Sequence, residues 1–206
     1  MKKMMKIAAA LAAMVMALSF IGCDNEDEDE YEIGDEGPGG GIVFYHSKDG
    51  FTVSINGEKA TCHYLECSPE SLGNIAWCPC SEPYCNVATS DGIGDGKDNT
   101  LKIIKATHYG ESVDASNCAA YACNEYSTET TEKGDWYLPS KTELGLIYEN
   151  LVEADDIISS KSWHWSSSQY STVNVWDQKF SNGEWGYSDD NIDKDWTDAV
   201  RAVHAF

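Results

Sequence analysis

The order of hydrophobic patterns along the chain constrains the fold most strongly. Runs typical of β-strands occur early, at residues 42–45 and 51–55, and again late, at residues 173–180 and 199–206. Helical patterns fall between these two groups. Strands followed by helices and then strands, with no strand–helix–strand repeat, indicate an α+β fold: antiparallel sheets with two or three flanking helices.

Turn signals predict how the first strands are connected. Lys48-Asp49-Gly50 separates the first two runs, and Asn56-Gly57 precedes a third run at residues 60–66. The opening is therefore expected to be a small antiparallel meander. The glycine-rich stretch before it, residues 37–41, is expected to be flexible.

The last part of the chain shows the same kind of pattern. Residues 163–167 alternate, and residues 181–184 are expected to close a hairpin between residues 173–180 and 185–187. The final run, residues 199–206, alternates cleanly, which predicts one strand held inside a sheet.

Three helices are predicted in the middle of the chain. The first is capped by Asn99 or Thr100, and the second by Asp114. The third begins with a capping box, in which the Ser140 hydroxyl accepts an early backbone N–H and the Glu143 side chain reaches back. Its core stripe consists of Leu144, Ile147, Tyr148 and Leu151.

The first 22 residues have the parts of an export signal. Three lysines precede an uncharged run at residues 7–21, which is too short to span a bilayer. The run ends in Ser19-Phe20-Ile21-Gly22-Cys23, which resembles a lipobox. Residues 1–22 are therefore predicted to be a lipoprotein signal peptide, with a lipid anchor on Cys23. An ordinary cleaved signal peptide is the alternative.

The segment after Cys23 is strongly acidic. Residues 24–36 contain nine acidic side chains and no basic one. Like charges repel and bury little surface, so residues 23–36 are expected to form a disordered tether. The tether would hold one domain, residues 37–206, away from a cell-envelope membrane, at the outer membrane or cell surface.

The charge of the chain limits its partners. Thirty-five acidic and 14 basic residues give a formal net charge of −21, and removing residues 1–22 takes away three lysines and no acid, which gives −24. Nucleic acids and sulfated polysaccharides need a basic footprint, so this charge argues against both. A cation or a basic partner suits it better.

The cysteines suggest disulfide bonds that form in an oxidising compartment. Cys118 and Cys123 are not expected to bridge each other, and Cys123 reads as a small core residue. Zinc held by cysteine thiolates is a less favoured alternative. The disulfide candidates are Cys62, Cys67, Cys78, Cys80 and Cys85.

Two acidic stretches contain the oxygen ligands that calcium prefers, but neither has the spacing of an EF-hand loop. Solvated turns are the preferred interpretation, so no cofactor and no metal site is assigned, and calcium is kept as an alternative. The stretches contain Asp91, Asp95 and Asp98, and Asp189, Asp190, Asp193 and Asp195.

Several segments in order resemble the C-terminal domain family of the Legionella collagen-like adhesin, over about residues 34–206. The resemblance implies a C-type-lectin-like fold in a surface lipoprotein, and glycosaminoglycan binding by the family's named member. That polyanion binding is not transferred, because this domain is strongly acidic. The matching segments are residues 37–45, 92–100, 135–144, 165–170, 180–183 and 200–206.

Aromatic side chains near the last turns are the candidates for ligand binding. Trp185, Tyr187 and Trp196 can stack on sugar rings, although buried core aromatics are the ordinary alternative. The histidines and nucleophilic residues show no catalytic motif. We therefore predict a non-enzymatic surface binding or adhesion module for an extracellular glycan or protein. A structural envelope lipoprotein without a dedicated ligand is the alternative.

Overall fold

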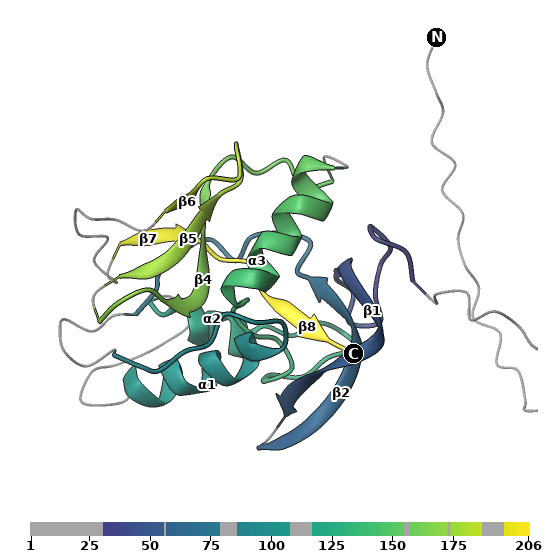
Figure 1. Cartoon of the computed structure of the whole chain (residues 1–206), viewed down its shortest axis with the longest axis horizontal. Helices are drawn as coiled ribbons and strands as arrows, with labels where there is room; N and C mark the ends of the chain where they lie inside the picture. Colours follow the sequence, from purple (N-terminus) through teal and green to yellow (C-terminus); the bar gives the residue numbers. More distant parts are fainter. Residues whose placement is uncertain are drawn as a thin grey trace, which may run out of the picture. The chain divides into compact units, whose positions relative to one another are not determined.

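A computed structural model describes residues 31–55, 57–78, 86–107, 117–154, 157–172, 174–186 and 196–206. Within these residues, three α-helices accompany two β-sheets (Figure 1). The predicted α+β class is confirmed.

The smaller sheet contains the beginning and the end of the domain. Its strands lie in the order β1-β2-β8, and both pairings are antiparallel. Ile55 lies opposite Glu58, so the chain reverses between these two residues, as the Asn-Gly signal predicts. The strands are β1 (Ile42–Ile55), β2 (Glu58–Cys67) and β8 (Val203–Ala205).

The expected three-stranded meander was wrong in one respect, because residues 42–55 form one strand, β1, and not two. His46 pairs with Tyr64 and Phe51 with Cys62, so the residues between His46 and Phe51 bulge out of the ladder. Gly50 has a φ of +73°, which suits glycine. The Asp49-Gly50 signal therefore marks a bulge within a strand and not a chain reversal.

The larger sheet has the strand order β3-β7-β4-β5-β6. Strands β4 and β7 are parallel, and the other pairs are antiparallel. The predicted hairpin onto Trp185 is confirmed, since β6 pairs with β5. The strands are β3 (Asn74–Ala76), β4 (Trp163–Gln169), β5 (Val175–Lys179), β6 (Trp185–Gly186) and β7 (Thr197–Ala199).

The last run of the chain is divided between the two sheets. Strand β7 belongs to the larger sheet and β8 to the smaller one. Between them, the Val200 N–H donates to the Gly73 carbonyl, and the Ala202 carbonyl accepts from Ser68 N–H. The prediction of one continuous strand was therefore wrong, because the residue 68–73 segment takes the intervening hydrogen bonds.

The helices are α1 (Asp95–Thr107), α2 (Ala119–Glu125) and α3 (Lys141–Ile147), and α3 continues as a π-helical turn η1 (Tyr148–Glu153). Helix α1 begins four residues before Asn99, so neither Asn99 nor Thr100 caps it. Asn99 is buried instead, and its side chain bonds the backbone of Ser90. Asp114, the predicted cap of the second helix, lies outside the described residues.

Helix α3 begins as predicted. The Ser140 hydroxyl accepts the Glu143 N–H at 3.2 Å, and the Glu143 carboxylate accepts the Ser140 N–H at 2.7 Å. Glu143 also accepts the Gly94 N–H at 2.8 Å, which ties the turn before α1 to this helix. Both side chains of the capping box are fully buried.

Helix α3 lies between the two sheets in Figure 1, with α1 and α2 below it. Its contacts with β1, β4 and β5 agree with that position. Two hydrophobic clusters fill the interior. One surrounds Trp77, Trp136 and Trp165, and the other joins Phe44 and Leu65 to helix α3.

The domain begins earlier than the expected residue 37. Gly34 donates to the Val43 carbonyl and Val43 to the Asp35 carbonyl. The Tyr31 ring makes edge contacts with Tyr64 and Phe206 at centroid distances of 5.5 and 5.3 Å. Residues 31–36 therefore pack on the domain and are not part of a free tether.

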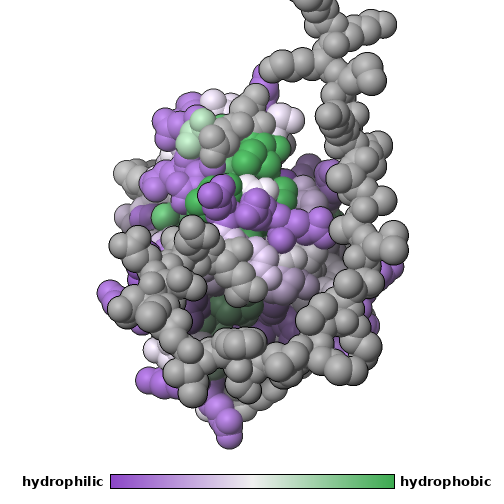
Figure 2. Space-filling model, turned by 90° about the vertical axis from the view of Figure 1, so that its right-hand side faces the viewer, coloured by the Kyte–Doolittle hydropathy of each residue, from purple (hydrophilic) through white to green (hydrophobic). Residues whose placement is uncertain are grey.

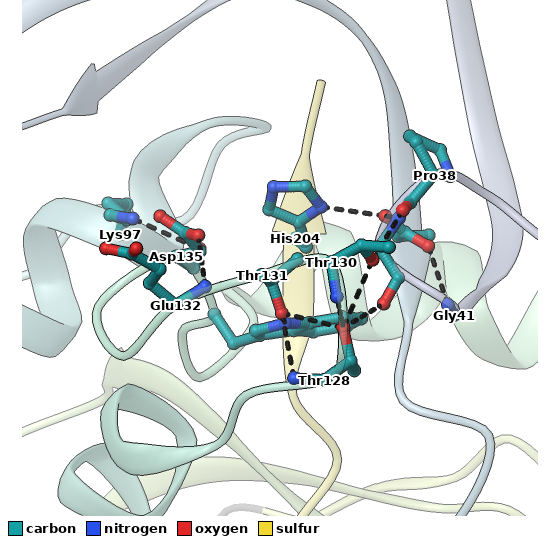
Figure 3. A network of polar contacts seen from close by, with 12 residues as sticks. Pro38, Gly41, Lys97, Thr128, Thr130, Thr131, Glu132, Asp135 and His204 are labelled. Atoms are coloured by element: carbon teal, nitrogen blue, oxygen red, sulfur yellow. Dashed lines mark hydrogen bonds and ion pairs between the residues drawn. The ribbon is translucent and has the colours of Figure 1, made fainter.

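The glycine-rich stretch at residues 37–41 is fixed and not flexible. The buried Glu66 carboxylate accepts the N–H groups of Gly39 and Gly41, at 2.8 and 2.7 Å, and pairs with His204 at 2.7 Å (Figure 3). A Cβ at Gly39 would lie 2.4 Å from a Glu66 oxygen. Thr128 holds the same stretch by donating to the Gly39 carbonyl.

Within the described part of the chain, no helix has the length and apolarity needed to cross a bilayer. Among the coloured residues visible in Figure 2, most are hydrophilic, and hydrophobic residues appear in separate patches between them.

Candidate ligand-binding groove

A lysine and three aromatic rings form a cluster beside the start of helix α3. The Lys141 ammonium lies 3.3 Å from the ring centroid of Trp176 and 5.3 Å from that of Trp185. The two tryptophans meet edge to face at 6.2 Å, and Tyr170 packs on Trp176 in the same way at 5.0 Å. Contacts of an ammonium with ring faces stabilise both partners by about 0.5–2 kcal/mol.

Strand register places the two tryptophans on one face of the larger sheet. Trp185 of β6 lies opposite Gln178 of β5, and Trp176 is two residues before Gln178, so the three side chains share a face. This face lies against helix α3. Gly145 of α3 lies next to the Trp185 ring, since a Cβ placed there would be in van der Waals contact with the ring, at 3.4 Å.

A groove of about 360 Å³ lies along this junction. Helix α3 and the beginning of η1 contribute Lys141, Thr142, Gly145 and Glu149, and β6 contributes Trp185. The remaining charged side chain is that of Asp91, from the loop before α1. The volume of the groove falls in the range of small-ligand sites, and one aromatic ring and several polar side chains line it.

A backbone hydrogen bond fixes the position of Asp91. The Thr142 N–H, in the first turn of α3, donates to the Asp91 carbonyl at 3.0 Å. The carboxylates of Asp91 and Glu149 are exposed, and neither forms an ion pair within the described residues. The groove thus offers two carboxylates to a ligand.

Two other carboxyl groups with raised pKa values belong to the larger sheet. Asp177 of β5 and Asp198 of β7 lie on the two strands that flank β4, and each influences the pKa of the other. Burial, and then Asp198, raises the pKa of Asp177 to about 7, while burial raises the pKa of Asp198 to about 6. Asp177 is 2% exposed and lies against Gly186. This position suits a structural carboxyl better than one that meets a substrate.

The structure separates the three aromatic residues predicted to bind ligand. Trp185 lines the groove. Trp196 directly precedes β7, is 59% exposed and does not line the groove. Tyr187 lies outside the described residues. Trp185 is therefore the candidate that the structure supports with a cavity.

The predicted cysteine framework is corrected in part. Cys62 and Cys67 both lie on β2, and both are free thiols buried in the hydrophobic core. Cys78 is disulfide-bonded, whereas Cys80, Cys85 and the predicted anchor Cys23 lie outside the described residues. The two cysteines not expected to bridge each other, Cys118 and Cys123, are free and buried.

Two of the three aspartates in the first acidic stretch lie in the first turn of α1 and make structural contacts. Asp95 accepts the Gly92 N–H at 2.8 Å, and Asp98 pairs with Lys102 at 2.7 Å. Among the described residues, no group of three or more His, Cys, Asp or Glu side chains is arranged to hold a metal ion. The second acidic stretch, residues 189–195, lies outside them.

The sequence pattern predicted Trp185 as a ligand-binding residue. It did not predict that Lys141, Asp91 and Glu149 line the same groove. Lys141 carries one local signal, since it directly follows the capping serine and is thus placed in the first turn of the helix. Asp91 and Glu149 carry none, because only tertiary packing brings them to Trp185.

Comparison with known proteins gives a fold and no family. No family model matches the chain, and no curated protein matches it. A fimbrial protein from Bacteroides ovatus ATCC 8483 has a similar structure, with a TM-score of 0.54 and 15% identity over 87% of this chain. The match covers 46% of that protein, so this chain spans about half of its length. At this identity, the likeness shows a shared fold only.

Proposed function

We propose that the chain is a membrane-anchored surface lipoprotein whose domain is a non-enzymatic binding or adhesion module, with a glycan ligand in the groove beside Trp185. The observation that carries this proposal is the groove itself. It combines a partly exposed tryptophan with carboxylate, ammonium and hydroxyl groups on a rigid helix.

These groups match the chemistry of sugars. A pyranose ring has an apolar face that stacks on an aromatic ring, and hydroxyls that need polar partners at its edge. Lys141 holds the rings of Trp176 and Trp185 in place, so little side-chain ordering is left to occur on binding.

A role at the cell surface is supported by the shared fold. The similar structure belongs to a protein named as fimbrial, and fimbriae are surface appendages. Export and a lipid on Cys23 remain predictions from the first 23 residues. The runner-up is a structural envelope lipoprotein with no dedicated ligand.

We also propose that the domain has the C-type-lectin-like fold and belongs to the family that its motifs resemble. Two of these motifs have a structural purpose. Residues 37–41 enclose the Glu66 carboxylate, and the Ser140–Glu143 capping box starts helix α3. Sheets with flanking helices are the arrangement that the resemblance implies.

The position of Tyr31 shortens the proposed tether. Only residues 24–30 remain between Cys23 and the packed domain, and seven extended residues reach at most about 25 Å. A lipid on Cys23 would therefore keep the domain near the bilayer.

A glycan array tests the proposed function. The wild-type domain is expected to bind a subset of glycans, with and without calcium, and Trp185→Ala is expected to lose that binding. Trp196→Ala removes an equally large and more exposed ring that lies outside the groove, so it serves as the matched control. Uniform silence of the wild type would favour the structural lipoprotein.

A further inference from the structure

The charges around the groove favour a particular class of sugar. Lys141 is the one cationic side chain among the residues that line the groove, and its ammonium lies over the rings of Trp176 and Trp185. The two carboxylates, of Asp91 and Glu149, form no ion pair in the described part of the chain. The side chains that line the groove therefore carry two negative charges and one positive charge, on a protein whose formal net charge is −21, and neither carboxylate is already paired with the ammonium.

Helix geometry spreads these charges along the groove. Lys141, Gly145 and Glu149 are four residues apart and lie on one face of the helical segment. Eight residues rise about 12 Å, which is on the order of two sugar rings. Asp91 lies at the Lys141 end, where it accepts the Thr142 N–H, and Glu149 lies alone at the other end.

We propose that the groove selects sugars with a free, protonated amino group, and that Asp91 and Glu149 determine this specificity. The inference rests on the proposed glycan-binding function and deepens it. The ring of an amino sugar stacks on Trp185, and its ammonium pairs with a groove carboxylate in a charge-assisted hydrogen bond.

The same charges disfavour the related sugars. An N-acetylated sugar has no charge to pair with the carboxylates, and a uronic or sulfated sugar is repelled by them. The long-range field of an acidic domain adds to both effects at low salt and is screened at high salt.

Binding of three oligomers of equal length tests the inference: glucosamine, N-acetylglucosamine and lysine. The measurement is made at about pH 6, where a free amine is protonated. The glucosamine oligomer is expected to bind best, and Asp91→Asn or Glu149→Gln to weaken it by about fivefold each. Asp49→Asn and Glu129→Gln, exposed and outside the groove, are charge-matched controls with no expected effect.

Three other outcomes of this binding experiment would each refute a specific proposal. If both sugar oligomers bind equally and Trp185→Ala abolishes both, the glycan site stands and the selectivity for amines is refuted. If the lysine oligomer binds as well as glucosamine and depends on the same carboxylates, the groove is a basic-peptide site and the amino-sugar proposal is overturned. If no sugar binds, both proposals fail.

Discussion

Asp177 illustrates how a single residue sets a property of the whole domain. Its carboxyl is buried beside Asp198, and its pKa of about 7 exceeds the ordinary value of 3.8. The folded protein therefore holds a proton that the unfolded chain releases at lower pH. Glu143, whose pKa burial raises to about 7, acts in the same direction.

Replacing Asp177 tests this effect. For the wild type, the free energy of unfolding is expected to fall as the pH rises from about 4 to about 7, because the unfolded state binds fewer protons in that window. Asp177→Asn keeps a donor for Asp198 and removes the ionisation. It is expected to stabilise the domain by about 1–2 kcal/mol at pH 8 and by little at pH 4.

Chemical denaturation at both pH values measures the difference, with the exposed Asp49→Asn as the control. An equal effect of Asp177→Asn at pH 4 and pH 8 would contradict the raised pKa.

The free thiols give a second prediction for individual residues. Cys62, Cys67, Cys118 and Cys123 are buried, and burial raises the pKa of Cys67 to about 12 and that of Cys118 to about 11. None is expected to react with iodoacetamide in the folded protein, and all four are expected to react in denaturant. Peptide mapping identifies the sites, and native labelling of Cys62 or Cys67 would refute the described packing.

At the scale of elements, the start of helix α3 supports both the core and the groove. The buried Ser140 hydroxyl accepts the Glu143 N–H and donates to the Gly92 carbonyl at 2.7 Å. Ser140→Ala removes both bonds and is expected to lower the free energy of unfolding by about 1–2 kcal/mol. Ser127→Ala, at an exposed position, is the control in the same denaturation experiment, and equal stability of the two variants would contradict the assigned cap.

Patterns within one segment were sufficient to predict most elements. The capping box, the Asn-Gly hairpin and the hairpin before Trp185 each depend on neighbouring residues, and each was found. Elements whose form depends on distant partners were not. The division of the last run follows from hydrogen bonds to Ser68 and Gly73, more than 100 residues earlier.

The N-terminal boundary was misplaced for a related reason. The acidic composition of residues 31–36 suggests a solvated tether, yet backbone bonds to Val43 and the contacts of Tyr31 hold them on the domain. The composition of these residues shows only that they are charged. Their packing depends on the Tyr31 ring and on backbone hydrogen bonds to the edge of strand β1.

The groove shows the same limit. The aromatic residues near the predicted hairpin indicated Trp185 as a ligand-binding residue. No local pattern predicted the other residues of the groove. The helix face with Lys141 and Glu149, and the loop with Asp91, meet Trp185 only through the packing of α3 on the larger sheet.

At the scale of the whole molecule, the predicted anchor makes a direct claim about the mature protein. Its first residue is expected to be Cys23 carrying a diacylglycerol, and the Cys23→Ala variant is expected to lose membrane association. Mass spectrometry of the mature N-terminus and membrane fractionation measure these. An unmodified Cys23, or a cut elsewhere, would refute the anchor.

The central claim is that the groove beside Trp185 binds a sugar, and an equilibrium titration tests it most directly. A glycan that binds the wild-type domain is titrated into the wild type, Trp185→Ala and Trp196→Ala, with thermal unfolding to confirm that each is folded. Trp185→Ala is expected to weaken binding by at least about tenfold, because it removes a central aromatic contact, and Trp196→Ala is expected to leave Kd unchanged. A folded Trp185→Ala protein with the wild-type Kd would contradict the central claim.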